Sequence, residues 1–243
     1  MFLLESGFKV TLVDPWGPGH SRSSSGDETR VIRSTYGANE TYFELNVASL
    51  RIWKEFEHRL SKKIFYNTGV LWLCYQERNP LVDDSIPYAR KHDMEYEYLS
   101  TADLERRFPI IHTDDLHHAF FDPFGGYLKA RESIQAVFDV FVNSGGLFVQ
   151  SAASPGVRKD SIMESIRLSN GNELHADAYV FACGSWLSKI FTNELPGLIQ
   201  CTKQEVYYFG VPQESSVQFD NLPVWIDVDG KDFYYGIRGN QYG

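Results

Sequence analysis

The sequence predicts an α/β fold (α+β overall), in which parallel-type strands and helices are interleaved with a mostly antiparallel part. Residues 8–13 and 178–183 are near-continuous apolar runs, typical of parallel strands covered on both faces. Residues 40–60 and 130–143 carry apolar side chains at spacings of three and four, which predicts two amphipathic helices. Aromatic, β-branched runs elsewhere indicate antiparallel strands.

Shorter elements are predicted between these. The chain opens as the end of a helix stopped by Gly7, and Ser100 with Asp103 forms the capping box of a helix that ends at Arg107. Further strands are predicted at 64–75, 96–99, 119–122, 147–150, 204–210 and 225–237, a helix at 82–92, and a hairpin from 162–168 and 174–178 around the turn 169–171.

Composition excludes several classes of protein. The net charge of -9 argues against nucleic acid or an anionic membrane as a partner. The chain has 3 cysteines without CxxC spacing, which indicates reduced thiols and no zinc site. His117 and His118 are adjacent and point apart, and with His112 they make no metal-binding motif, so no metal is expected. No apolar run reaches the roughly 18 residues of a membrane span, and no signal peptide is evident, which predicts a cytoplasmic protein.

The segment 23–33 is the strongest functional candidate. Arg30 and Arg33 follow a run of serine and glycine, after a strand that ends in Asp14. Two guanidinium groups at such a place suit an anionic or electron-rich ligand. The alternative is a solvated loop whose arginines pair with Asp27 and Glu28.

Four pieces of sequence, in order, resemble the D-amino-acid oxidase superfamily of FAD-dependent oxidoreductases, and within it the monomeric sarcosine oxidase and N-methyltryptophan oxidase group. They are VTLVDPWGPGHSRSSSGDETRVIRSTYG, NTGVL, FDPFGGYLKA and FACGSWLSKI. The resemblance covers nearly the whole chain. It implies FAD as cofactor, a small amine or amino acid as substrate, and molecular oxygen as acceptor. It also implies that the complete protein is a monomer.

The resemblance implies a role for each candidate residue. Asp14, at the end of the second parallel strand, would bind the ribose of the dinucleotide. Arg30 would stabilise negative charge on the reduced flavin, and Arg33 would pair with the substrate carboxylate. The remaining positions that match the family are the cofactor-lining Ser24 and Ser25, Thr29 beside the flavin, the turn residues Gly184 and Trp186 near the flavin, and Tyr235 in the substrate pocket.

The implied reaction is a hydride-type transfer from the carbon next to the amine nitrogen, giving an imine and, on reoxidation, hydrogen peroxide. The resemblance also implies two interleaved domains. An incomplete Rossmann-like FAD-binding domain would comprise 1–66 and 126–200, and an incomplete substrate domain would comprise 67–125 and 201–243.

Some family features are not found. The first strand and its glycine-rich turn would precede Met1, the lysine and cysteine of the sarcosine oxidases would follow Gly243, and a histidine of some members is Gly26. We therefore expect a chain truncated at both ends. One alternative is a non-catalytic remnant, or a chain that needs another chain to complete its fold. An NAD-dependent dehydrogenase is disfavoured by the twin arginines and the small second domain.

Because the pyrophosphate-binding turn is expected to lie outside these 243 residues, we predict that the purified chain binds FAD weakly or not at all. The absorbance spectrum of the recombinant chain, before and after incubation with FAD and desalting, measures this. A flavin band that persists through purification would contradict the prediction.

Overall fold

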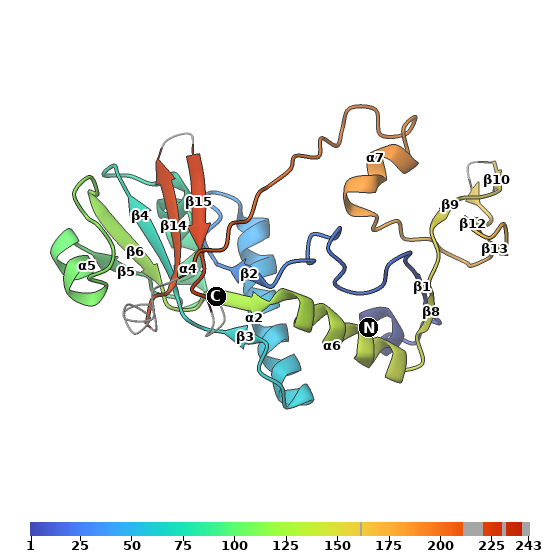
Figure 1. Cartoon of the computed structure of the whole chain (residues 1–243), viewed down its shortest axis with the longest axis horizontal. Helices are drawn as coiled ribbons and strands as arrows, with labels where there is room; N and C mark the ends of the chain where they lie inside the picture. The colour runs from blue at the N-terminus through green and yellow to red at the C-terminus, as the bar shows by residue number, and fades with distance from the viewer. Residues whose placement is uncertain (161, 211–220, 230–231, 240–243) are drawn as a thin grey trace. The chain divides into compact units, whose positions relative to one another are not determined.

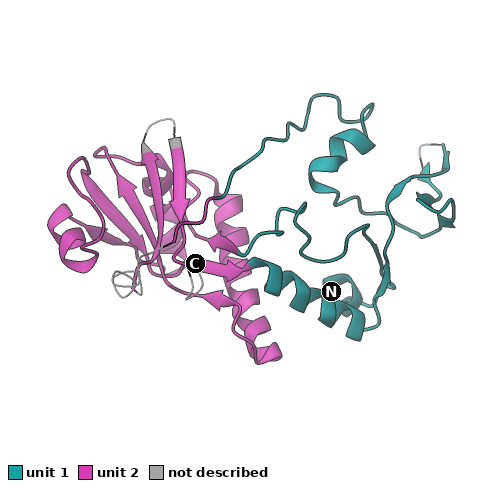
Figure 2. Cartoon of the chain, in the orientation of Figure 1, with its two compact units in different colours: residues 1–28, 130–206 teal, residues 29–129, 207–243 magenta. Residues whose placement is uncertain are grey.

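The computed structural model describes residues 1–160, 162–210, 221–229 and 232–239. The chain divides into two compact units, coloured separately in Figure 2. Unit 1 comprises residues 1–28 and 130–206, and unit 2 comprises residues 29–129 and 207–243. Residues 29–66 therefore group with the strands that follow them. These units reflect contacts between residues, so the division into a cofactor domain and a substrate domain stays a prediction.

Unit 1 contains a parallel pair of strands, β1 (Thr11–Val13) and β8 (Leu147–Val149). Helix α6 (Ala130–Asn143) leads into β8, and the rings of Phe138 and Phe148 meet edge to face at 5.0 Å. The helix has the predicted bounds. The other elements of unit 1 are α1 (Phe2–Glu5), β9 (Ala153–Pro155), β10 (Arg158–Lys159), β11 (Ile162–Met163), β12 (Ile166–Leu168), β13 (Glu173–Leu174), η1 (Gly184–Trp186) and α7 (Leu187–Ile190). The predicted hairpin is confirmed by the antiparallel pairing of β12 with β13.

Two strand predictions in this part of the chain are wrong, and a third is confirmed only in part. The strand predicted at 8–13 begins at Thr11, the carbonyl of Val10 accepts a hydrogen bond from the N–H of Leu147, and Phe8 is exposed. Residues 178–183 and 204–210 form no strand, and Val180 and Phe209 are 81% and 80% exposed. An extended apolar segment becomes a strand only where a neighbouring strand bonds its backbone. Within the described residues, β1 has β8 as its single neighbour and 178–183 has none.

Unit 2 is built on a five-stranded sheet in the order β15-β14-β4-β6-β5 and a three-stranded sheet in the order β2-β7-β3 (Figure 1). β14 runs parallel to β4, and the other pairs are antiparallel. The strands are β2 (Thr29–Ile32), β3 (Phe65–Tyr66), β4 (Val70–Cys74), β5 (Glu97–Leu99), β6 (His118–Asp122), β7 (Gly126–Lys129), β14 (Val224–Asp229) and β15 (Asp232–Gly236). The strands within 67–125 and 201–243 are thus mostly antiparallel, as predicted, with the β14–β4 pair as the exception. The strands β2, β3 and β7 lie in the segments predicted as the FAD-binding domain, and they also pair antiparallel.

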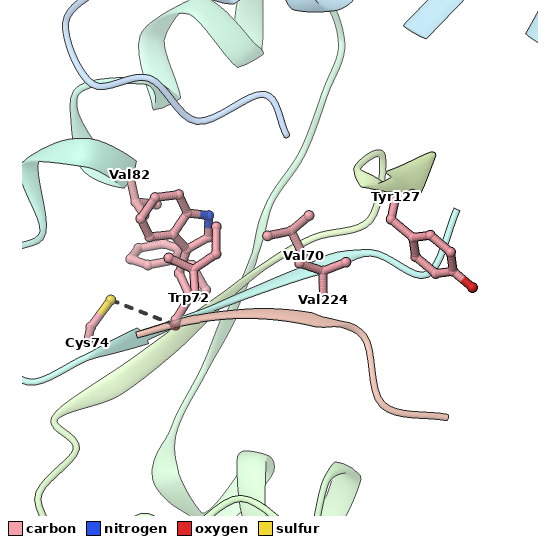
Figure 3. Close-up of a cluster of buried hydrophobic side chains, with 8 residues drawn as sticks. Val70, Trp72, Cys74, Val82, Tyr127 and Val224 are labelled. Atoms are coloured by element: carbon pink, nitrogen blue, oxygen red, sulfur yellow. Dashed lines mark hydrogen bonds between the residues drawn. The ribbon is translucent and has the colours of Figure 1, made fainter. Parts of the chain in front are cut away.

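The core of unit 2 gathers around the central strand β4, all of whose residues are buried. On one face, Trp72 packs with Val82 and with Val224 of β14 (Figure 3). The opposite face of β4 packs Leu71 and Leu73 against Leu104. A strand covered on both faces explains its unbroken apolar sequence.

The helices of unit 2 are α2 (Glu40–Leu60), α3 (Pro80–Asp83), α4 (Ile86–Lys91) and α5 (Thr101–Arg107). The bounds of α2 and the capping box of α5 are confirmed. The helix predicted at 82–92 is instead two short helices. Pro87 lies in the first turn of α4, where its missing N–H is tolerated but a continuous helix is not.

Gly69 sits in the left-handed region, with φ of 76°, just before β4. A Cβ placed there would lie 2.2 Å from Cζ of Phe121. We expect Gly69→Ala to destabilise the chain by about 2–4 kcal/mol, through backbone strain together with overpacking. Urea unfolding followed by circular dichroism measures this.

Gly171→Ala is the matched control, because Gly171 also has positive φ (87°) but no atom within 4 Å of its Cβ position. It should cost only about 1 kcal/mol, from strain alone. Equal effects of the two substitutions would contradict the role of Phe121.

Candidate active site

Asp14 follows β1 in unit 1, at the carboxyl end of the parallel pair. Its Oδ1 accepts hydrogen bonds from the backbone N–H groups of Trp16 (2.8 Å) and Gly17 (2.7 Å). Its Oδ2 lies 3.9 Å from Nε2 of His20. One carboxylate oxygen therefore fixes the turn, and the other has room for a further donor.

An aromatic cluster surrounds this turn. The Trp16 ring lies 4.9 Å from His20 and 5.2 Å from Trp186, and the Arg22 guanidinium lies 5.0 Å from its centroid. Burial, and then the charge of Asp14, raise the pKa of the Cys183 thiol. Unit 1 therefore brings the candidate residues Asp14, Gly184 and Trp186 into one region. Gly184 has positive φ (50°) and no atom within 4 Å of its Cβ position.

Ser24 is exposed and Ser25 is half-buried in the turn that follows. The next residue, Gly26, is buried, and its carbonyl accepts a 3.0 Å hydrogen bond from Arg131. A Cβ on Gly26 would lie 2.2 Å from the carbonyl oxygen of His20. The backbone packing of this loop thus leaves no room for a side chain at Gly26.

Thr29 and Arg30 begin β2 in unit 2, opposite Lys129 and Leu128 of β7. Nη1 of Arg30 donates to the carbonyl of Thr29 at 2.8 Å. These contacts place both residues at one end of the three-stranded sheet.

Arg33 lies just past the end of β2, and aromatic rings surround its guanidinium. The Cζ atom is 5.3 Å from the Tyr36 centroid, 5.2 Å from Trp72 and 5.3 Å from Phe233. Burial lowers the pKa of Arg33, and Tyr36 and Tyr235 oppose that shift. Among the described residues, no carboxylate lies within ion-pair distance of Arg33.

Unit 2 therefore brings Arg33 and the candidate Tyr235 close enough to interact electrostatically, and Tyr235 is 44% exposed. The ring contacts of Tyr36, Trp72 and Phe233 were not predicted. Trp72 and Phe233 come from two strands far from Arg33 in the sequence, so no local pattern could reveal them, whereas Tyr36 lies only three residues after Arg33. Tyr36 also lines an open cavity of about 610 Å³ beside the first turn of α2.

The histidine pair lies on β6 and just before it. The prediction that their side chains point apart is wrong, because Nδ1 of His117 is 3.0 Å from Nδ1 of His118. The His118 ring stacks on Tyr98 at 4.7 Å. Burial, and then the charge of His117, lower the pKa of His118 against a smaller effect of Asp83. In the described part of the chain, no three potential ligands gather in a metal-binding group. The described helices also include none long and apolar enough to cross a bilayer.

The lowered pKa makes His118 a source of acid sensitivity. The unfolded chain binds the proton first as pH falls below about 6.5, so stability drops from there until the folded-state pKa is passed. We expect His118→Phe to flatten the difference in unfolding free energy between pH 7.5 and 5.5, measured by urea unfolding. His112→Gln, at an exposed position, is the control and should leave that difference unchanged.

The FAD dependent oxidoreductase family called DAO matches residues 1–241, and the chain belongs to that family. It is 26% identical over 239 residues to monomeric sarcosine oxidase from Bacillus sp. (strain B-0618), covering 97% of this chain and 60% of the relative. It is 20% identical over 234 residues to N-methyl-L-tryptophan oxidase from Yersinia pestis (strain Pestoides F), covering 96% and 62%.

Solved structures support the same fold. A modified fructosyl peptide oxidase from Aspergillus nidulans superposes with a TM-score of 0.73 at 19% identity, covering 99% of this chain and 58% of that one. L-proline dehydrogenase from P. horikoshii superposes with a TM-score of 0.68 at 16% identity, covering 79% and 50%. The chain spans about 60% of the length of the curated relatives it matches.

Proposed function

We propose that this chain carries the substrate-binding and part of the cofactor-binding machinery of an FAD-dependent oxidase. Its substrate would be a small amine or N-methyl amino acid, oxidised at the C–N bond. Membership of the family and the likeness to sarcosine and N-methyltryptophan oxidases support the class of reaction.

The environment of Arg33 is the observation that carries the proposal. A partly buried guanidinium without an anionic partner in the described residues has lost hydration without gaining an ion pair. A substrate carboxylate would restore that interaction through two parallel hydrogen bonds. We assign this role to Arg33, with Tyr235 beside the bound substrate.

The residues of unit 1 fit an adenine dinucleotide. Oδ2 of Asp14 can accept from ribose hydroxyls, and Trp16 and Trp186 offer aromatic surface next to it. FAD, when bound, supplies the electron acceptor for oxidation of the substrate carbon. We propose that Ser24, Ser25, Thr29, Arg30 and Gly184 also contact it. Arg30 would supply positive charge, which stabilises an anionic ring.

Molecular oxygen is the proposed acceptor, with hydrogen peroxide as product. Relatives named as oxidases support this, whereas the dehydrogenase among the structural neighbours shares the fold alone. Peroxide formation during turnover, compared with reduction of an artificial dye, tests the acceptor separately from the substrate.

A second candidate is a non-catalytic chain that depends on another chain. The 81% exposure of Val180, in an apolar run with no strand neighbour in the described residues, favours this reading. Absence of oxidation by the full-length protein with every amine tested, at saturating FAD, would favour it over the oxidase.

Arg33→Ala tests the carboxylate role. Sarcosine and dimethylamine differ by the carboxylate, so the substitution should lower kcat/KM for sarcosine roughly 10- to 100-fold more than for dimethylamine, because a charged hydrogen bond is lost. Oxidation by the full-length protein, in which the FAD-binding part is expected to be complete, is followed by peroxide release with added FAD.

Arg51→Ala is the control, since Arg51 is an exposed cation on α2 paired with Glu55. It should leave both rates unchanged. Equal losses for the two substrates in Arg33→Ala would sink the assigned role.

A further inference from the structure

Asp122, the last residue of β6, is the only fully buried acidic residue among the described residues, with 1% of its surface exposed. Its Oδ2 accepts from the backbone N–H (3.1 Å) and the hydroxyl (2.7 Å) of Ser34. Its Oδ1 accepts from the backbone N–H groups of Phe124 (2.9 Å) and Gly125 (3.3 Å). No basic side chain of the described residues pairs with it. Four donors hold this carboxylate in place.

The hydrogen bonds from Ser34 to Asp122 fix the residue that directly follows Arg33. The ladder between β2 and β7 ends where Ile32 faces Gly126, so the backbone of Arg33 lies beyond the last ladder pair. The next fixed point is Ser34, held by Asp122 across a sequence separation of 88 residues. Arg33 is therefore held between the ladder on one side and the Asp122 carboxylate on the other.

Asp122 is also paired with the strand that carries one of the rings around the Arg33 guanidinium. Asp122 faces Val70 of β4, and Trp72 lies two positions along the same strand, on the same face. At Gly125, a Cβ would lie 2.6 Å from Cγ2 of Val70 and 2.8 Å from the carbonyl oxygen of Ile32. The turn after Asp122 thus packs tightly against both strands, and it joins the end of β2 to the sheet that carries Trp72.

A hydroxyl extends the network. The Tyr96 hydroxyl lies 2.9 Å from Oγ of Ser34, so Ser34 connects Tyr96 to Asp122. Burial raises the pKa of Tyr96, and the nearby Asp122 adds to that shift, so the phenol stays protonated and able to donate.

We propose that Asp122 is the positioning residue of the carboxylate-binding site. By bonding the backbone and hydroxyl of Ser34, it fixes the direction in which Arg33 leaves the sheet and keeps the guanidinium among Tyr36, Trp72 and Phe233. The inference rests on the proposed function only for the identity of the anion that Arg33 binds.

An amide cannot replace the carboxylate in this role. Asn in place of Asp122 keeps one accepting oxygen and presents an NH₂ group to the second pair of donors. If the oxygen stays with the turn, the N–H of Ser34 faces another donor. If it turns to Ser34, the N–H groups of Phe124 and Gly125 lose their acceptor instead. Asp122→Asn therefore loosens the backbone next to Arg33 without touching the guanidinium.

The test uses the 243-residue chain and acetate, the simplest carboxylate, with acetamide as the neutral comparison. The Nε–Hε resonance of Arg33 is assigned by its loss in Arg33→Lys, and it is followed by NMR during titration. We expect Asp122→Asn to move or broaden this resonance before any ligand is added, and to weaken acetate binding at least 10-fold.

Asp103→Asn is the matched control. Oδ2 of Asp103 also accepts from the N–H (3.3 Å) and hydroxyl (2.6 Å) of a serine, Ser100, in an exposed capping box in the same unit. It should lower stability yet leave the Arg33 resonance and the acetate affinity unchanged. A purely structural role of Asp122 predicts that the two variants behave alike.

The outcomes separate the two proposals. An unmoved resonance and unchanged acetate affinity in Asp122→Asn would overturn the positioning role while leaving the function of Arg33 intact. If acetate does not bind the parent chain, the carboxylate role fails, and the ligand-free resonance alone decides the positioning role. If Asp122→Asn does not fold, Ser34→Ala serves instead, because it removes the hydrogen bond from the Ser34 hydroxyl to Asp122 and keeps the one from the Ser34 N–H. A loss of acetate affinity of about 3-fold, or a shifted Arg33 resonance, then supports the proposal. An unchanged affinity and an unmoved resonance refute it.

Discussion

The central strand β4 is the constraint on which unit 2 depends. Strands β14 and β6 pair with its two edges, and apolar side chains pack on both of its faces, so its position is fixed from every direction. Trp72 on one of its faces lies beneath the Arg33 guanidinium. Val70 on the same face is paired with Asp122, which holds the neighbouring Ser34. The geometry of the proposed substrate site is therefore a property of the sheet core.

Local signals in the sequence predicted local elements well. Helices α2 and α6 appear with the predicted bounds, because a long amphipathic period and the residues at the helix ends are all contained in the segment itself. The capping box at Ser100 is likewise local. The runs 178–183 and 204–210 failed as strands, because a strand depends on a partner that its own sequence does not specify.

The candidate site was predicted in part for the same reason. The segment 23–33 carries a dense local motif, so Arg30 and Arg33 could be singled out from the sequence. The rings around Arg33 could not, since Trp72 and Phe233 reach it from strands β4 and β15. The role of Asp122 could not be predicted for a similar reason. Its local sequence is typical of an ordinary turn, and the residue that it bonds, Ser34, lies 88 positions away in the sequence.

Both units are made of two separated chain segments, and this affects how the protein must form. During synthesis, β4 leaves the ribosome early, whereas β14, which pairs with it in parallel, emerges only after all of unit 1 has been made. Until then one edge of a strongly apolar strand stays open to mispairing. The platform under Arg33 is therefore incomplete until β14 has been made, and before then the open edge of β4 needs protection from mispairing.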